Sequence, residues 1–412
     1  MRLTVERLGH LGDGIAREPD GDPVFVPMAL PGEVVEGEVT DGRMAAPKIV
    51  TPSPDRVTAP CPHYRACGGC ALMHASNSLV ARWKEDVVRT ALAAQGIAAP
   101  FRPVVTSPPR SRRRATLAGR RTKSGAIVGF HGRASGTIVE VPGCKLLHPG
   151  LMTALPALAE ITALGASRKG EVALALTHGE AGLDLAVSSG KPLDQSLFSA
   201  LSGVAGRVDF ARLTWGGQVI AARRPVIQRF GAAHVVPPPG AFLQATAEGE
   251  AALLSAVCDA VGPARRVADL FAGAGTFTLP LADRREVHAV EGDAAMLAAL
   301  DAGWRQTPGL RRVTTEARDL FRRPLLPDQM KGFDAVVIDP PRAGAEAQMR
   351  AIAASRIAVV AAVSCNPVSF ARDARILLAA GFVLDWVQVV DQFRWSPHVE
   401  LAARLSRVIT GS

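Results

Sequence analysis

Long apolar runs and aromatic side chains are both scarce in this sequence. No stretch approaches the ~18 uninterrupted apolar residues of a membrane-spanning helix, and the first residues lack the apolar core of a secretory signal. These absences predict a cytoplasmic protein that does not contact a membrane. Aromatic residues make up 5% of the chain, with a single tyrosine, so most of the rings that could stack on a planar ligand are those of the 14 phenylalanines.

Cysteine is also rare, and its few positions are unevenly spaced. The six cysteines are Cys61, Cys67, Cys70, Cys144, Cys258 and Cys365. Because thiols stay reduced in the cytosol, we do not interpret this spacing as a disulfide framework. The grouping of three thiols within ten residues points instead to a metal site.

Apolar residues and positive charge are plentiful. The hydrophobic content of 48% is enough for sizeable cores, so wholesale disorder is excluded. The net charge of +9 favours an anionic partner such as nucleic acid, although charge alone does not separate this from a basic protein without such a partner.

The pattern of apolar and polar residues divides the chain into three regions. Residues 1–57 alternate within short runs between tight turns, which predicts an oligonucleotide-binding-type (OB-like) β-barrel. Residues 58–235 mix helical and strand patterns, which predicts an α+β domain. Residues 236–412 alternate strands and helices, which predicts a doubly wound, Rossmann-like parallel sheet. The predicted fold class is therefore α/β.

Strand ends in the last region carry a candidate cofactor site, because ligands bind at the carboxyl ends of such strands. These ends are Asp269 to Thr276, Glu291, Asp319, Asp339 and Cys365. Gly273 and Gly275 allow a tight turn close to a ligand, but the third glycine of a dinucleotide site is replaced by Thr278. Glu291 lies about 20 residues after Asp269, where an acid that binds a ribose hydroxyl is expected. The pattern favours S-adenosylmethionine.

Cys365 lies between a buried strand pattern and a helical pattern. We expect the helix N-terminus to lower the pKa of its thiol. A thiolate that adds to C6 of a pyrimidine makes C5 nucleophilic towards a methyl group, and a base must then remove the C5 proton. Glu400, in a later strand-like stretch, is a candidate for that base. The local sequence leaves a buried structural thiol as an equal alternative.

Several motifs occur together along the chain. They are "GDGIAR", "CPHYRACGGCALMH", "FLQAT", "DLFAGAGTFTLPLA", "DPPRAG", "SCNP" and "HVE". With them the chain resembles the RNA uracil-C5 methyltransferases, class I S-adenosylmethionine-dependent enzymes with a TRAM-like N-terminal domain that make 5-methyluridine. The resemblance covers nearly the whole chain. It implies methyl transfer to C5 of a uridine, with 23S rRNA favoured over tRNA as the substrate.

The resemblance also implies roles for individual residues. Cys365 is the expected nucleophile, and Glu400 is the expected base. Residues expected around the cofactor and the flipped uracil are Gln244, Phe271, Gly273, Gly275, Thr276, Glu291, Asp319 and Asp339. Thr246 replaces a family Asn, which leaves the role of that Asn open here, and Met73 replaces a family Gln before His74.

Four cysteines form a candidate metal-binding set. It consists of Cys61, Cys67 and Cys70, in the spacing C-x5-C-x2-C, and Cys144. Four thiolates suit a [4Fe–4S] cluster or zinc, and spacing alone does not decide. Three histidines keep mixed zinc ligation open: His63, His74 and His148. The resemblance favours a [4Fe–4S] cluster with a structural or RNA-positioning role.

A basic run from Arg102 to Lys123 is a candidate phosphate-binding surface. If it contains a strand, Arg112, Arg114 and Arg120 share one face and could hold RNA phosphates, whereas a solvated basic face is the alternative. Phe242 or Phe271 would stack on a base.

Two other functions compete with uracil methylation. An RNA cytosine-C5 methyltransferase generally needs a second cysteine, and Cys258 lies in an ordinary helical pattern. A non-catalytic RNA-binding scaffold is the other alternative, with Thr246 as its main support. The sequence shows no strong oligomerisation motif, which favours a monomer.

Overall fold

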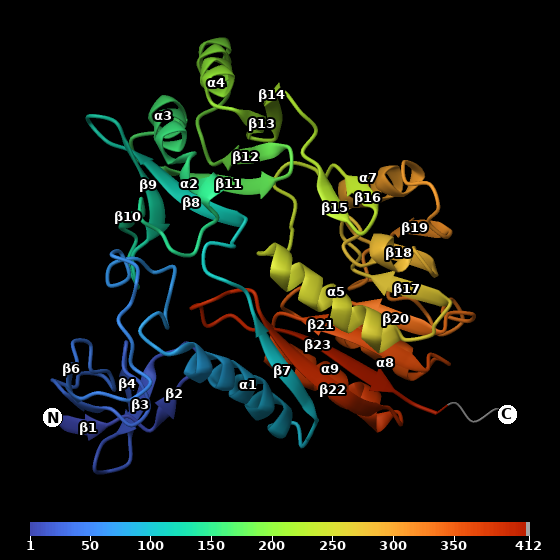
Figure 1. The fold of residues 1–412 in the computed structure, drawn as a ribbon, viewed down its shortest axis with the longest axis horizontal. Helices are drawn as coiled ribbons and strands as arrows, with labels where there is room; N and C mark the ends of the chain where they lie inside the picture. The colour runs from blue at the N-terminus through green and yellow to red at the C-terminus, as the bar shows by residue number, and fades with distance from the viewer. Residues whose placement is uncertain (409–412) are drawn as a thin grey trace.

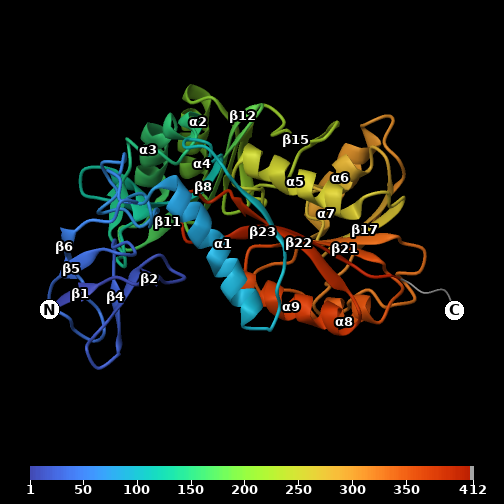
Figure 2. The ribbon, with the colours of Figure 1, turned by 60° about the horizontal axis from the view of Figure 1, so that its bottom comes forward.

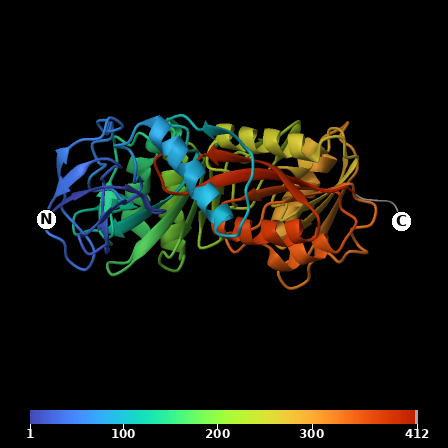
Figure 3. The same ribbon diagram turned by 90° about the horizontal axis from the view of Figure 1, so that it is seen from below.

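The computed structural model describes residues 1–408 and contains three parts (Figure 1). A small β module holds the N-terminus, a second sheet with three helices lies above it, and a large sheet covered by helices forms the C-terminal part. Seen from below, the β module and the C-terminal sheet lie at opposite ends of an elongated molecule (Figure 3).

The N-terminal module is made of two three-stranded antiparallel sheets, in the orders β1-β5-β6 and β2-β3-β4. Their strands are β1 (Arg2–Thr4), β2 (Arg7–Leu8), β3 (Gly14–Arg17), β4 (Pro23–Val26), β5 (Val34–Glu36) and β6 (Lys48–Thr51). Alternate side chains such as Leu3, Val24 and Val35 meet in one core, as the period-two pattern predicts. The β module is confirmed, with six strands, and its closure into a barrel stays a prediction.

The central part is a seven-stranded sheet in the order β10-β9-β8-β11-β12-β13-β14. Its elements are β8 (Arg114–Arg121), β9 (Ala126–His131), β10 (Ile138–Glu140), α2 (Pro149–Met152), α3 (Leu155–Gly165), β11 (Glu171–Gly179), β12 (Gly182–Ser188), α4 (Gln195–Arg207), β13 (Phe210–Trp215) and β14 (Gln218–Ala222). Helices α3 and α4 pack on it around a core that includes Leu158, Leu174 and Leu201. A hairpin of β15 (Gln228–Phe230) and β16 (Ala233–Val235) follows.

The C-terminal sheet has eight strands in the order β19-β18-β17-β20-β21-β23-β22-β7. They are β7 (Phe101–Thr106), β17 (Arg266–Leu270), β18 (Glu286–Glu291), β19 (Val313–Ala317), β20 (Ala335–Ile338), β21 (Val359–Ser364), β22 (Val383–Asp391) and β23 (Glu400–Ser406). The five strands from β19 to β21 are parallel and reverse their order between β17 and β20, which confirms the Rossmann-like arrangement. The sheet is not wholly parallel, because β23 runs antiparallel to both neighbours.

Helices cover both faces of this sheet (Figure 2). They are α1 (Asn77–Ala93), α5 (Ala247–Val261), α6 (Thr278–Leu281), α7 (Ala294–Arg305), α8 (Glu346–Ala353) and α9 (Pro367–Ala379). Strand residues alternate between two cores: Val337 contacts the α5 side, whereas Val336 and Ile338 contact the side of α1, α8 and α9. The near-continuous apolar strands are those expected of a sheet buried on both faces.

One edge strand comes from an unexpected part of the sequence. Strand β7 lies within residues 58–235 but pairs in parallel with β22 of the C-terminal sheet. Helix α1, which precedes it, packs against α9. The division of the chain at residues 57 and 235 therefore stays a prediction. Helix α1 and strand β7 lie in the central region of the sequence but pack with the C-terminal sheet.

Among residues 1–408, no helix combines the length and the apolarity needed to cross a lipid bilayer.

Candidate active site

The strand ends predicted to carry the site lie at one edge of the C-terminal sheet. Parallel strands β17, β18, β20 and β21 end there, and antiparallel β23 begins there with Glu400. Ser364 pairs with Leu401, so one register step further the chain places Cys365 beside Glu400. The expected nucleophile and the expected base are thus brought together by strand pairing.

The turn after β17 has the strained backbone of a ligand-binding loop. Phe271, Gly273 and Gly275 have φ of 62°, 56° and 98°, which only glycine adopts at little cost. A Cβ on Gly275 would lie 2.9 Å from side-chain carbons of Leu279 and Leu300, so the residue must be glycine. Thr276 lies half-buried in the same turn.

Two acids of β17 and β18 support this turn. Glu291 accepts hydrogen bonds from the backbone N–H of Gly273 at 2.9 Å and of Asp293 at 2.9 Å. Asp269 is fully buried, and its Oδ2 accepts from the Thr278 hydroxyl at 2.5 Å. Burial raises the pKa of Asp269 to about 7. Its Oδ1 has no hydrogen-bond partner within residues 1–408, which leaves a buried acceptor for a ligand.

Asp319 is exposed and makes local contacts. Its Oδ1 accepts from the backbone N–H of Phe321 at 3.0 Å and of Arg322 at 3.3 Å. Phe321 stands near Phe271, with 5.4 Å between the ring centroids, and is half exposed. This aromatic pair beside the turn was not predicted. The sequence offers only a weak indication of it, a phenylalanine two residues after the acid Asp319.

The three titratable groups of the reactive centre have raised pKa values. The pKa of the Cys365 thiol is raised to about 11, first by burial and then by the carboxyls of Glu400 and Asp339. Burial also raises the pKa of Asp339 to about 8 and that of Glu400 to about 7. The expectation of a lowered thiol pKa was wrong, because desolvation and two nearby acids outweigh the N-terminus of α9. Cys365 is therefore a neutral thiol near pH 7.

Buried amides connect this centre to the chain before α5. Gln392 Nε2 donates to Gln244 Oε1 at 2.6 Å and to Glu400 Oε2 at 3.0 Å. Thr246 caps α5, since its hydroxyl oxygen accepts from the Gly249 backbone N–H at 2.9 Å. Threonine is a common N-cap residue, so Thr246, which replaces the family Asn, has a structural role at the start of α5.

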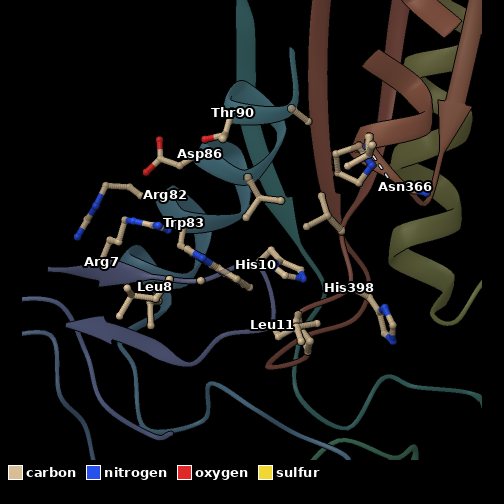
Figure 4. A pocket seen from close by; sticks show the side chains of 18 of the residues that line it. Arg7, Leu8, His10, Leu11, Arg82, Trp83, Asp86, Thr90, Asn366 and His398 are labelled. Carbon is tan, nitrogen blue, oxygen red and sulfur yellow. Dashed lines mark hydrogen bonds between the residues drawn. The ribbon is translucent and has the colours of Figure 1, made fainter. Parts of the chain in front are cut away.

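A groove of about 950 Å³ leads to Cys365 from the N-terminal module (Figure 4). One wall is β2 with the following loop, which carries Arg7, His10 and Leu11. Another wall is α1, and the end near Cys365 is formed by the segments around Asn366 and His398. The groove was not predicted, because its walls come from three distant parts of the sequence.

The β module is fixed to the groove's helical wall by apolar packing. Leu8 and Leu30 of the module pack with Val80 and Trp83 of α1 in one cluster. Burial of these side chains holds the module beside the catalytic sheet, at roughly 1.5–3 kcal/mol for each large residue.

The predicted basic face is only partly available. Strand β8 alternates as expected, but Arg120 is paired with Glu171. The guanidinium of Arg114 lies over the ring of Phe242, 5.0 Å from its centroid, and Phe242 is 57% exposed. Arg112 lies 5.8 Å from the ring centroid of Phe393.

The four predicted cysteine ligands converge in space. Cys61, Cys70 and Cys144 pack against one apolar cluster. Burial raises the pKa of the Cys67 and Cys70 thiols, and the charge of nearby cysteines of the set raises it further. The backbone N–H of Gly69 donates to Cys67 Sγ at 3.4 Å, and the backbone N–H of Leu146 donates to Cys144 Sγ at 3.4 Å. No group of three or more His, Cys, Asp or Glu within residues 1–408 is arranged to hold a metal ion.

The three nearby histidines have other partners in this structure. His63 Nε2 accepts from the backbone N–H of Gly143 at 3.2 Å, and His148 Nδ1 accepts from that of Gly150 at 3.1 Å. His74 Nδ1 lies 2.6 Å from the Tyr64 hydroxyl. These contacts give no support to mixed zinc ligation.

The fold is that of a class I methyltransferase preceded by a small β module. The family model of the TRAM domain matches residues 1–44. The chain is 44% identical to an RNA methyltransferase of Caulobacter vibrioides, over 98% of this chain and 99% of that protein. It is 32% identical to the 23S rRNA (uracil(1939)-C(5))-methyltransferase RlmD of Halomonas elongata, over 97% and 88% respectively.

A solved structure has the same fold over the whole chain. The Pyrococcus abyssi tRNA (uracil-54, C5)-methyltransferase, in complex with S-adenosyl-L-homocysteine, superposes with a TM-score of 0.78 at 22% identity and covers 98% of this chain and 99% of that chain. By its sequence relatives, the protein belongs to the RNA uracil-C5 methyltransferase family.

Proposed function

We propose that this protein transfers a methyl group from S-adenosylmethionine to C5 of a uridine in 23S rRNA. Cys365 is the nucleophile and Glu400 is the base. The observation that supports the proposal is the register of β21 and β23, which continues to Cys365 opposite Glu400, together with the electrostatic effect of Glu400 on the thiol. Cys365 itself lines the groove. The RlmD relative supports rRNA over tRNA as the substrate.

The chain offers a site that fits the cofactor. The glycine turn at Gly273 and Gly275 leaves room for close approach, Glu291 has the strand-end position of a ribose ligand, and Asp269 Oδ1 is a buried acceptor without a partner within residues 1–408. When bound, S-adenosylmethionine supplies an electrophilic methyl group on its sulfonium. The Phe271 and Phe321 rings stand where they can cover a planar base.

The first step of the chemistry is addition of the Cys365 sulfur to C6 of the uracil. The S–C6 bond forms, the electrons of the C5=C6 bond move towards C5 and O4, and the thiol proton passes to the Asp339 carboxylate, so that Glu400 stays able to accept the C5 proton. C5 would then form a bond to the sulfonium methyl group as the bond between that methyl group and sulfur breaks, which would leave S-adenosylhomocysteine. Asp339 and Glu400 are the two acids that act electrostatically on this thiol. Since the thiol is neutral in the free protein, it is a weak nucleophile until the substrate binds.

Glu400 resolves the methylated adduct. Its carboxylate takes the C5 proton, the electrons of the C5–H bond form the C5=C6 bond, and the S–C6 bond breaks to return a thiolate. A carboxyl with pKa of about 7 is suited to this role near neutral pH.

The cysteine set is proposed to hold a [4Fe–4S] cluster. In such a cluster each of the four thiolates binds a different iron, whereas one zinc ion would take all four as its own ligands. Cys61, Cys67, Cys70 and Cys144 would bind it, and N–H groups that approach two of the sulfurs suit thiolates. The cluster would hold the loop that carries these residues.

The RNA is proposed to lie in the groove. Arg7, Arg82 and Arg342 line it and can contact phosphates, while the target base enters the pocket beside Cys365. Of the groove's lining residues only Cys365 is a thiol, which counts against a cytosine-C5 methyltransferase.

The test is nucleoside analysis of RNA from a strain that lacks this gene, after incubation with the protein and labelled S-adenosylmethionine. We expect labelled 5-methyluridine from the wild type and from the matched thiol control Cys258→Ala, and none from Cys365→Ala. Label in 5-methylcytidine would establish the cytosine reaction instead. No label, despite bound cofactor, would favour the RNA-binding scaffold.

A further inference from the structure

Gln392 is a fully buried residue that the sequence motifs do not include. It follows β22 directly, and β22 runs parallel to β7 and antiparallel to β23, so its carboxyl end lies at the edge that carries Cys365 and Glu400. The side chain of Gln392 is 1% exposed and lies between the buried Gln244, which was predicted to contact the cofactor or the uracil, and the proposed base Glu400.

The hydrogen bonds of Gln392 define the orientation of its amide. Its Oε1 accepts from the backbone N–H of Ala245 at 2.8 Å, and a backbone N–H can only donate. The amide nitrogen must therefore face the other way, where its two hydrogens reach Gln244 Oε1 and Glu400 Oε2. Every strong donor of this amide is used.

The backbone on both sides of Gln392 is held by a buried lysine. Lys84 of α1 is 0% exposed and forms an ion pair with Asp391. Its ammonium also donates to the carbonyl oxygens of Phe393 at 3.1 Å and His398 at 2.8 Å. These bonds connect the two ends of the segment between β22 and β23, and this segment leads from Gln392 to Glu400.

We propose that Gln392 is a positioning residue that orients Glu400 for removal of the C5 proton and couples it to Gln244 in the pocket. The inference rests on the proposed function. By holding Oε2 of Glu400, the amide leaves Oε1 free to take the proton, and a donor to the carboxylate favours its ionised form. Gln392 does not touch the reacting atoms, and it acts through Glu400.

The test uses the fate of the covalent adduct in the full-length protein. If Glu400 is displaced, the methyl group is still transferred but the adduct is not resolved, so a protein–RNA species that survives denaturation accumulates. We expect Gln392→Leu to accumulate this species and to lower kcat by about 100-fold, since a misplacement of about 1 Å can have this effect. Glu400→Gln is the positive reference for trapping.

Gln348→Leu is the matched control. Gln348 is likewise 1% exposed, and its amide bonds the backbone N–H and carbonyl of Leu325, on α8 away from the groove. We expect it to lower stability to a similar extent without any adduct. Turnover by Gln392→Leu at the wild-type rate, or an equal loss of methylation in both variants without adduct, would overturn the positioning role.

A charge-changing variant gives a second readout. Gln392→Glu can donate to Glu400 only while the new carboxyl is protonated, and its ionised form repels Glu400. Adduct is therefore expected to increase from pH 6 to pH 8 in this variant and to decrease in the wild type. The same pH trend in both proteins would overturn the inference. Failure of the proposed function would appear separately, as absence of 5-methyluridine from the wild type and of adduct from Glu400→Gln, and it would overturn this inference as well.

Discussion

At the scale of single residues, the centre is governed by burial of acids beside a thiol. Asp339, Glu400 and Cys365 all have raised pKa values because each is buried. The carboxyl of Glu400 raises the pKa of Asp339 further, and both carboxyls raise that of Cys365. Such a cluster favours neutral forms in the free protein, and the charge needed for reaction arises when substrate excludes water and brings its own polar groups.

The pKa of Glu400 predicts the pH dependence of adduct resolution. Protonated Glu400 cannot take a proton, so below pH 7 the resolution rate is expected to fall about tenfold per pH unit, and above pH 7 it levels off. The measurement is a pH jump on adduct preformed at pH 6, followed by quenching and gel separation. The sulfur of Cys365 is already bonded in this species, so its own pKa does not enter. A rate that does not change between pH 5.5 and 7 would contradict the assignment of Glu400.

The residues of the site that the sequence reveals are those at the ends of recognisable strands. Glu291, Asp339 and Cys365 were predicted to face one edge for this reason, and the structure places them there. The prediction of a lowered thiol pKa was wrong, because it considered the helix N-terminus and left out burial of the thiol and the two nearby acids, Glu400 and Asp339. Gln392 was missed because residues 383–391 were not recognised as a strand.

At the scale of elements, the turn after β17 depends on one glycine for two reasons. Gly275 combines φ of 98° with two side-chain carbons that would lie 2.9 Å from an added methyl group. Gly275→Ala is expected to lower the free energy of unfolding by about 2–4 kcal/mol, as the sum of backbone strain and overpacking. It should also weaken binding of S-adenosylmethionine.

Gly309→Ala separates the two contributions. Gly309 has a similar φ of 93° but nothing within 4 Å of its added methyl, so only the backbone cost of about 1 kcal/mol is expected. Chemical denaturation of both variants, with cofactor titration by calorimetry, checks the difference. Equal destabilisation would show that packing around Gly275 relaxes.

The sequence predicted the elements correctly where strands and helices alternate, but it did not predict β7 at the edge of the C-terminal sheet. Strand β7 contains Pro103, which a central strand does not tolerate, and it was treated as part of a basic run. The structure shows why the proline is allowed, since β7 is an edge strand bonded only to β22. A strand that joins a distant sheet leaves no local signal of its partner.

At the scale of the whole molecule, the crossing of α1 and β7 predicts that the C-terminal region does not fold alone. Val88, Leu92 and Ile97 belong to the core on one face of its sheet. A fragment of residues 236–412 is expected to be aggregated or loosely packed, because that face and the edge of β22 are uncovered. Co-expression with residues 77–106 should restore solubility. Near-ultraviolet circular dichroism checks this, and a native-like spectrum from the fragment alone would contradict it.

The position of the β module beside the catalytic sheet makes RNA binding a property of the whole chain. Arg7 of the module lines the same groove as Arg342, which acts electrostatically on Cys365, and residues of α1 line it as well. An RNA strand that reaches the pocket would therefore contact both, and removal of either charge should weaken binding similarly for all sequences.

Arg7→Ala tests this arrangement through salt dependence. Loss of one phosphate contact is expected to reduce the slope of log affinity against log salt by about 0.7 for single-stranded RNA. Arg2→Ala is the matched control, because Arg2 is exposed on β1 of the same module and does not line the groove. Fluorescence anisotropy at several salt concentrations measures both. If the two variants lose the same slope, the module attracts RNA by its general charge, and if Arg7→Ala alone does, the RNA strand runs along the groove towards Cys365.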